Sequence, residues 1–231
     1  IFSAGNDINH LYVPRTSEET FVKFWTSLTR FLTSLYVSEL FTCAAIYGFC
    51  AAAGTGIALC CDLRIADPTA ALGLNEAALG IPPPKYWSQL LIRTIGQRQA
   101  ERLLTQGLII KAAEAMKVGL VDRVVEARSK ENENTKAQNG REQVVEVCIE
   151  LCKQQNVAVN ASGRKQTKMQ IRKPFADAWY LYGINEEPYA SWKLLSQDET
   201  IMALGNVMQN LKKKTKKSNE QGPTERNERN E

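Results

Sequence analysis

The segment of small residues CAAAGTG, Cys50–Gly56, constrains the fold of this chain more than any other feature. An apolar run at residues 41–47 precedes it and the apolar run IALCCDL follows it. The first run is typical of a strand buried on both faces, and the second of a buried helix. The simplest structure is therefore a strand, a tight turn and a buried helix. The small residues either allow close helix–strand packing or leave the first helix amides uncovered, where they can bind negative charge.

Strands and helices are predicted to alternate along the first half of the chain. Apolar residues spaced three and four apart predict a helix over residues 16–36. The sequence further predicts short strands at residues 63–66, 71–74 and 120–125, and helices at residues 86–95, 97–106 and 112–118. This alternation indicates an α/β architecture with parallel strands.

The second half of the chain has a different pattern. The polar residues 128–141 predict a solvated loop or an insertion. Helices are predicted over residues 144–155, 163–182 and 198–211. We therefore divide the chain into an α/β core at residues 1–127, a polar loop and helical region at 128–211, and a disordered basic and polar tail at 212–231. The opening residues IFSAG are typical of a strand end, so we expect N-terminal strands to be missing.

Composition limits the classes of function. The chain has 231 residues, a formal net charge of +4 and 44% hydrophobic residues, which fits one globular domain with a small appendage. No charge-free apolar run approaches the roughly 18 residues of a membrane span. The charge is weak support for a nucleic-acid partner, because five of the lysines lie within residues 212–217.

The cysteines and the histidine limit the possible chemistry. Six cysteines lie among apolar neighbours without a CxxC spacing, so we expect no zinc site and interpret them as small buried hydrophobes in a reducing compartment. His10 is the only histidine, so a Ser–His–Asp or Cys–His site would have to use it. A surface or capping role is favoured for His10.

Two further segments could take part in chemistry. In FSAGNDI, Phe2–Ile8, a glycine at a strand end allows a sharp turn that aims the following amides outward. In LGLNEAALGI, Leu72–Ile81, Glu76 stands among apolar residues, where burial would make it a base near neutral pH. Each segment alone has a simpler interpretation. For the first it is an ordinary turn, and for the second it is a carboxylate at an exposed strand end or a charge at a helix N-terminus.

The order and spacing of these segments resemble the crotonase superfamily, also called the enoyl-CoA hydratase/isomerase family. The resemblance lies in FSAGNDI, AAIYGFCAAAGTGIALCCDLRIA, LGLNEAALGIPPP and IGQRQAERLLTQGLIIKAAEAMKVGLVDRVV. It implies an α/β fold, a crotonase-like superhelix of stacked ββα turns with a helical C-terminal trimerisation region. It also implies an acyl-CoA thioester substrate, no metal or separate cofactor because CoA is part of the substrate, and a homotrimer.

The resemblance assigns roles to individual positions. Glu76 would be the catalytic base. The backbone amides of Asn6 and Ala53 would form an oxyanion hole, although the second position is usually Gly in the family. The substrate-binding positions would be Ala4, Gly5, Asp7, Ile8, Gly54 and Asn75.

The carboxylates decide the subfamily that we expect. Hydratases of the family use two glutamates, and here Gly56 occupies the first position and Glu76 the second. One base can move a proton between two carbons, and NEAALGI is similar to mitochondrial-type Δ3,Δ2-enoyl-CoA isomerases. We therefore expect isomerisation of 3-enoyl-CoA to trans-2-enoyl-CoA in unsaturated fatty acid β-oxidation, in the mitochondrial matrix or a peroxisome-like organelle. The alternatives are an enoyl-CoA hydratase or another acyl-CoA-processing enzyme, and a non-catalytic RNA-associated or binding member.

Four more side chains have two possible interpretations each. Asp7 is expected to accept hydrogen bonds from backbone amides, and Asp62 to fix the turn after the buried helix. Trp25 and Trp87 are expected in the core, with a place in the wall of an acyl site as the alternative.

Overall fold

Two small sheets form the centre of the computed structural model, which describes residues 1–125 and 133–220. The first sheet has the order β1-β3-β6 and the second the order β2-β4-β5. All pairs are parallel except β4 with β5. The strands are β1 (Cys43–Ile46), β2 (Phe49–Ala51), β3 (Leu63–Ala66), β4 (Ala71–Gly73), β5 (Ile110–Lys111) and β6 (Arg123–Val124).

The register of the strands stacks one ββα turn on the next. Cys43 of β1 pairs with Leu63 of β3, and Phe49 of β2 pairs with Ala71 of β4. Each strand pair is followed by helical structure, α2 (Ala53–Cys60) after β2 and the 3-10 helix η3 (Glu76–Leu79) after β4. The expected α/β fold of stacked ββα turns is confirmed.

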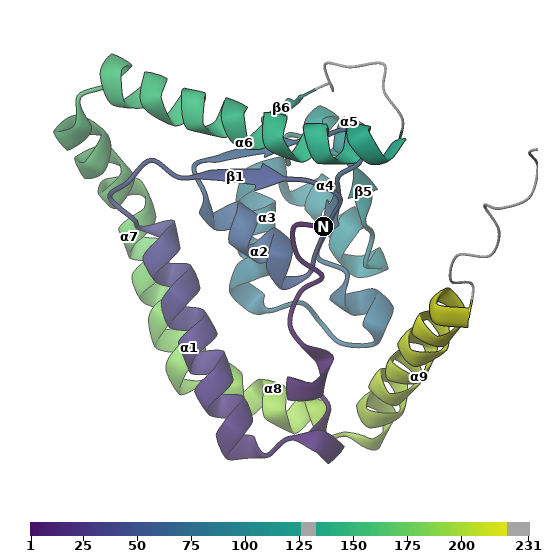
Figure 1. Cartoon of the computed structure of the whole chain (residues 1–231). Helices are drawn as coiled ribbons and strands as arrows, with labels where there is room; N and C mark the ends of the chain where they lie inside the picture. The colour runs from purple at the N-terminus through teal and green to yellow at the C-terminus, as the bar shows by residue number, and fades with distance from the viewer. Residues whose placement is uncertain (126–132, 221–231) are drawn as a thin grey trace, which may run out of the picture.

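Long helices surround this core (Figure 1). Helices α1 and α7 lie side by side, and α6 crosses the face of β1 (Figure 1). Ser17 caps the first turn of α1 by accepting a hydrogen bond from the Thr20 amide. The helices are η1 (Ile8–His10), η2 (Val13–Arg15), α1 (Glu18–Tyr36), α3 (Lys85–Ile95), α4 (Gln97–Gln106), α5 (Ala112–Lys117), α6 (Glu133–Ala158), α7 (Ala161–Asn185), α8 (Glu187–Leu195) and α9 (Asp198–Glu220).

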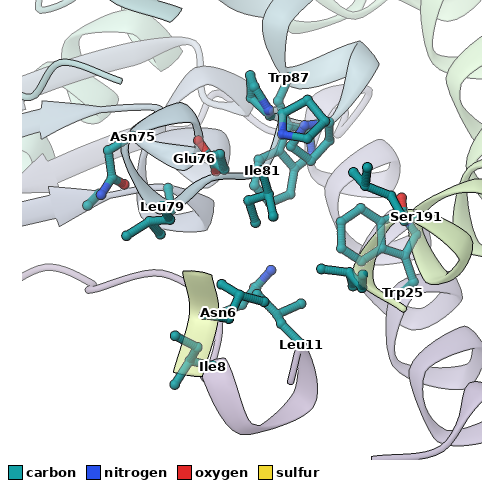
Figure 2. Close-up of a pocket in the computed structure, with 18 of the residues that line it drawn as sticks. Asn6, Ile8, Leu11, Trp25, Asn75, Glu76, Leu79, Ile81, Trp87 and Ser191 are labelled. Atoms are coloured by element: carbon teal, nitrogen blue, oxygen red, sulfur yellow. The ribbon is translucent and has the colours of Figure 1, made fainter. Parts of the chain in front are cut away.

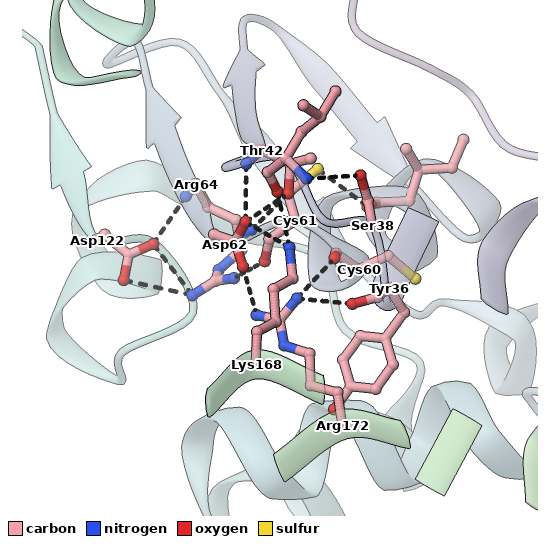
Figure 3. Close-up of polar contacts among 12 residues, drawn as sticks. Tyr36, Ser38, Thr42, Cys60, Cys61, Asp62, Arg64, Asp122, Lys168 and Arg172 are labelled. Atoms are coloured by element: carbon pink, nitrogen blue, oxygen red, sulfur yellow. Dashed lines mark hydrogen bonds and ion pairs between the residues drawn. The ribbon is translucent and has the colours of Figure 1, made fainter. Parts of the chain in front are cut away.

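A buried ion cluster attaches α7 to the core (Figure 3). The Asp62 carboxylate accepts hydrogen bonds from the Thr42 amide at 2.7 Å and from Lys168 Nζ at 2.8 Å, and it pairs with the Arg172 guanidinium at 2.9 Å. Arg172 Nη1 also donates to the Tyr36 carbonyl at the end of α1. The sequence predicts that Asp62 fixes the turn that follows it, whereas its carboxylate binds two distant segments, Thr42 before β1 and the α7 residues Lys168 and Arg172.

Several predicted boundaries are wrong. The predicted polar loop at residues 128–141 is helical from Glu133 onward, and residues 128–132 lie outside the described residues. The predicted disordered tail at 212–231 continues α9 to Glu220, while residues 221–231 lie outside the described residues. The strand predicted at 120–125 is only two residues long, and α8 was not predicted.

Within residues 1–125 and 133–220, no helix combines the length and the apolar character that a membrane crossing requires.

Candidate active site

A cavity of about 840 Å³ lies between the α/β core and the C-terminal helices α8 and α9. Glu76, Asn75 and Ile81 lie along its core side, and Asn6, Ile8 and Leu11 of the N-terminal segment lie opposite (Figure 2). Its wall is mostly apolar, with contributions that include Ala4, Trp25, Ala52, Leu79, Pro83, Trp87, Leu194, Leu195, Leu204 and Val207.

Local backbone geometry places Glu76 in this cavity. Helix η3 begins at Glu76, two residues after the buried Leu74, and ends at Gly80, which has the left-handed φ of 82°. Gly107 lies against η3 so closely that an added Cβ would be 2.4 Å from the Ala78 nitrogen. The end of α4 therefore packs against η3, and this contact fixes the position of the Glu76 backbone.

The Glu76 carboxylate is buried, and one of its oxygens is unpartnered. Glu76 is only 5% exposed, and its Oε2 atom has no hydrogen-bond partner. Burial raises the pKa of Glu76 to about 7. The neighbouring Asn75 Oδ1 atom is likewise buried and unpartnered. A carboxylate with this pKa can accept and return a proton near neutral pH.

Two segments with free backbone amides meet beside this carboxylate. The Ser3 amide donates to the Phe49 carbonyl and the Ala51 amide donates to the Ser3 carbonyl, both at 3.0 Å, so the N-terminal segment runs parallel to β2. Gly5 has a φ of 97°, and an added Cβ there would lie 2.9 Å from the Ala52 Cβ. The turn that contains Asn6 therefore packs directly on the start of α2.

The start of α2 contains a strained residue. Ala52 has φ 50° and ψ −120°, and it is the only non-glycine residue with positive φ in the described part of the chain. Such a conformation costs about 1–3 kcal/mol and is frequent at functional sites. The amide of Ala53, the first residue of α2, has no acceptor among the described residues, and the same holds for the Asn6 amide. Both can donate to a ligand oxygen.

Trp87 fills the space beside Gly56. An added Cβ on Gly56 would lie 3.3 Å from the Trp87 ring. A glutamate at this position therefore has no room unless the indole moves.

A second carboxylate, which the sequence analysis did not identify, also lines the cavity. Glu187 is 5% exposed, but each of its oxygens accepts a hydrogen bond, Oε2 from Trp25 Nε1 at 3.2 Å and Oε1 from the Lys85 amide at 3.0 Å. Burial raises the pKa of Glu187, while these two hydrogen bonds oppose that effect. Both neighbours are donors, so they favour the carboxylate form.

The structure brings five of the nine predicted site residues to the cavity wall, namely Ala4, Asn6, Ile8, Asn75 and Glu76. Gly5 and Gly54 instead permit close packing, since an added Cβ on Gly54 would lie 2.8 Å from the Ser3 Cβ. Ala53 is buried and is not among the residues that line the cavity, although its amide has no acceptor among the described residues. Asp7 is exposed and accepts from the Asn9 amide, as its alternative interpretation predicted. His10 is exposed and stacks on Phe24.

Comparison with known proteins defines the class. The sequence profile of the enoyl-CoA hydratase/isomerase family matches residues 1–179. Because the match covers most of the chain and the stacked ββα turns agree with it, this protein belongs to the enoyl-CoA hydratase/isomerase family, the crotonase superfamily.

Particular relatives are similar over different shares of the chain. The mitochondrial enoyl-CoA delta isomerase 1 of Mus musculus is 39% identical over 127 residues, which are 54% of this chain and 43% of the mouse protein. A short-chain-enoyl-CoA hydratase of Clostridium acetobutylicum is 35% identical over 153 residues, 66% of this chain and 58% of that protein. The crystal structure of human mitochondrial delta3-delta2-enoyl-CoA isomerase superposes with a TM-score of 0.81 at 31% identity, covering 93% of this chain and 77% of that one. The aligned part thus amounts to less than half of the mouse protein's length.

Proposed function

We propose that this protein converts 3-enoyl-CoA to trans-2-enoyl-CoA, with Glu76 as the only proton-transfer group. The observation on which the proposal depends is the bare Oε2 atom of Glu76, buried in a mostly apolar cavity that Asn6 and Ala52 also line. The amides of Asn6 and Ala53 have no acceptor among the described residues. The thioester oxygen accepts hydrogen bonds from the amides of Asn6 and Ala53. Preorganised donors of this kind stabilise the developing negative charge, and loss of one typically costs about 3 kcal/mol of transition-state stabilisation.

The proton moves along one substrate. The Glu76 carboxylate removes a proton from C2, and the electrons of that bond pass into a dienolate whose negative charge is on the thioester oxygen. The same carboxyl group then returns the proton to C4, which restores the thioester carbonyl and leaves the double bond between C2 and C3. Proton and electrons balance, and no co-reactant is consumed. The apolar wall favours this reaction because it excludes water from the dienolate.

Three observations favour isomerisation over hydration. Gly56 has no acid function, and even a Cβ added there would lie 3.3 Å from the Trp87 ring. The other cavity carboxylate, Glu187, already accepts hydrogen bonds at both oxygens. Among the cavity residues that the structure describes, Glu76 and Glu187 are the only carboxylates, so no second carboxylate with a free oxygen accompanies Glu76. Hydration needs one group to activate water and another to protonate C2.

The test compares two reactions of the natural chain. Spectroscopic assays with a 3-enoyl-CoA and with crotonyl-CoA should show isomerisation of the first and little hydration of the second. A hydration rate equal to or above the isomerisation rate would show that a second acid operates and would favour the hydratase alternative. The Clostridium acetobutylicum relative is named as such a hydratase.

Assembly and compartment belong to the same proposal. We propose a homotrimer in the mitochondrial matrix, supported by the family membership and by relatives named as mitochondrial. Light scattering coupled to gel filtration and fractionation of the source cells test the two statements separately.

A further inference from the structure

Glu187 connects three helices through its buried carboxylate. The residue begins α8, its Oε2 atom accepts from the indole Nε1 of Trp25 on α1, and its Oε1 atom accepts from the amide of Lys85 at the start of α3. All three residues line the cavity. The hydrogen bond to Nε1 fixes which edge of the Trp25 ring faces Glu187, and packing on the nearly parallel Trp87 ring sets the ring plane.

The Trp25 ring belongs to a stack that closes the cavity. It lies nearly parallel to the Trp87 ring, with 6.4 Å between centroids and 8° between planes, and its other neighbour is Phe21 at 5.3 Å. Trp87 in turn packs on Gly56 at the start of α2. The two indoles are 8% and 3% exposed, and both line the cavity.

The cavity has a polar end and an aromatic end. Figure 2 shows Trp25 and Ser191 across the cavity from Asn75, with Glu76 nearer to Asn75. An acyl chain whose C2 and C4 lie beside Glu76 extends its tail away from the polar group, along the apolar wall. The tail therefore approaches the ring of Trp25, which contacts Glu187 and Phe21 as well.

We propose that Trp25 is the end wall of the acyl site and that Glu187 is the positioning residue that holds it, so that the pair limits the length of acyl chain accepted. This inference rests on the proposed function, because it needs an acyl-CoA in the cavity. It assigns Glu187 no proton transfer.

Binding of saturated acyl-CoAs tests the inference without turnover. Isothermal titration calorimetry with straight-chain acyl-CoAs from butyryl to hexadecanoyl, in steps of two carbons, gives the chain length at which Kd stops falling. Trp25→Leu should move that length upward by at least one step. Each newly buried methylene is worth about fourfold in Kd, so one step of two carbons should strengthen binding about fifteenfold where the natural chain gains nothing.

Two further variants separate positioning from general loosening. Glu187→Gln should move the length limit in the same direction by less, because a glutamine carbonyl accepts from only one of the two donors and its amide group faces the other. Trp192→Leu is the matched control, since Trp192 packs on Phe21 in the same cluster but does not line the cavity. Its length limit should equal that of the natural chain. Thermal melts confirm that each variant is folded.

The outcomes are distinct. An unchanged length limit in both Trp25→Leu and Glu187→Gln would overturn the inference and leave the proposed function standing. An equal shift in Trp192→Leu would also overturn it, because loosening of the α1–α8 contact would then explain the effect. If the natural chain binds none of the acyl-CoAs, the proposed function fails, and this inference fails with it.

Discussion

Replacing Glu76 with glutamine should abolish proton transfer and also stabilise the protein, with a defined pH dependence. Burial raises the pKa of this carboxyl from its ordinary value of 4.5 to about 7. A carboxyl group whose pKa is raised in the folded state favours folding at low pH, and this advantage is lost as the pH rises through 7. With these two values, ionisation should destabilise the natural chain by about 2.5 kcal/mol more at pH 8 than at pH 5. Glutamine does not ionise, so the variant escapes this loss.

Urea unfolding of the natural chain and of Glu76→Gln between about pH 5 and pH 8 measures this difference. The free energy of unfolding of the variant minus that of the natural chain should grow as the pH rises from about 5 and level off above pH 7. Any effect of the substitution that does not depend on pH shifts all of these differences equally. Asn75→Ala is the control, because it alters the same wall of the cavity without removing a titratable group. Turnover of Glu76→Gln should fall by about a hundredfold or more. A pH-independent stability difference would refute the assigned pKa, and near-normal turnover would remove Glu76 from the mechanism.

The remaining predictions concern the start of α2 and the ion cluster. Ala53→Val should lower turnover by crowding the free amide, while Asn6→Ala keeps its backbone N–H and should largely spare turnover; equal losses in steady-state assays would contradict the backbone-donor argument. Ala52→Gly should raise the free energy of unfolding by about 1 kcal/mol, because relief of the positive φ outweighs the added flexibility of glycine, and a lower Tm would refute this. Asp62→Asn should cost about 3 kcal/mol, because two largely buried cations lose their counter-charge. A variant as stable as the natural chain in urea would show that the cluster is replaceable.

The residues alone predict the alternation of strands and helices in the first half of the chain, but they miss the short strands β2 and β5, and the stacking of ββα turns was expected only from the resemblance to the family. The small residues around Gly54 predict either close packing of a helix on a strand or uncovered helix amides, and the structure also places Ser3 of the N-terminal segment against Gly54, which the sequence did not predict. Glu76 stands out because a lone carboxylate in an apolar stretch is costly. These signals depend on neighbours within a few residues, which is what makes them visible in a single sequence.

The errors in the C-terminal half have physical reasons. Residues 133–141 are polar, and polarity favoured a loop, but glutamate, lysine, glutamine and alanine are good helix formers, so the segment extends α6. Helix α8 is only nine residues long and depends on packing more than on its own propensity. The hydrogen bond between Trp25 and Glu187 spans 162 residues, and no local pattern predicts such a contact.

The wall of the cavity shows how one environment separates two buried carboxylates. Glu187 faces two N–H donors and stabilises the contact between three helices, whereas Glu76 faces none at Oε2 and destabilises the fold when ionised. The strained Ala52 lies in the same wall and also opposes folding. Such costs persist only where the surrounding structure compensates, and here the stacked indoles and the Asp62 cluster provide contacts of that kind. The residues that oppose folding are therefore Glu76, to which we assign the proton transfer, and Ala52, which directly precedes an amide that we assign to the oxyanion hole, and the contacts that favour folding hold both in place.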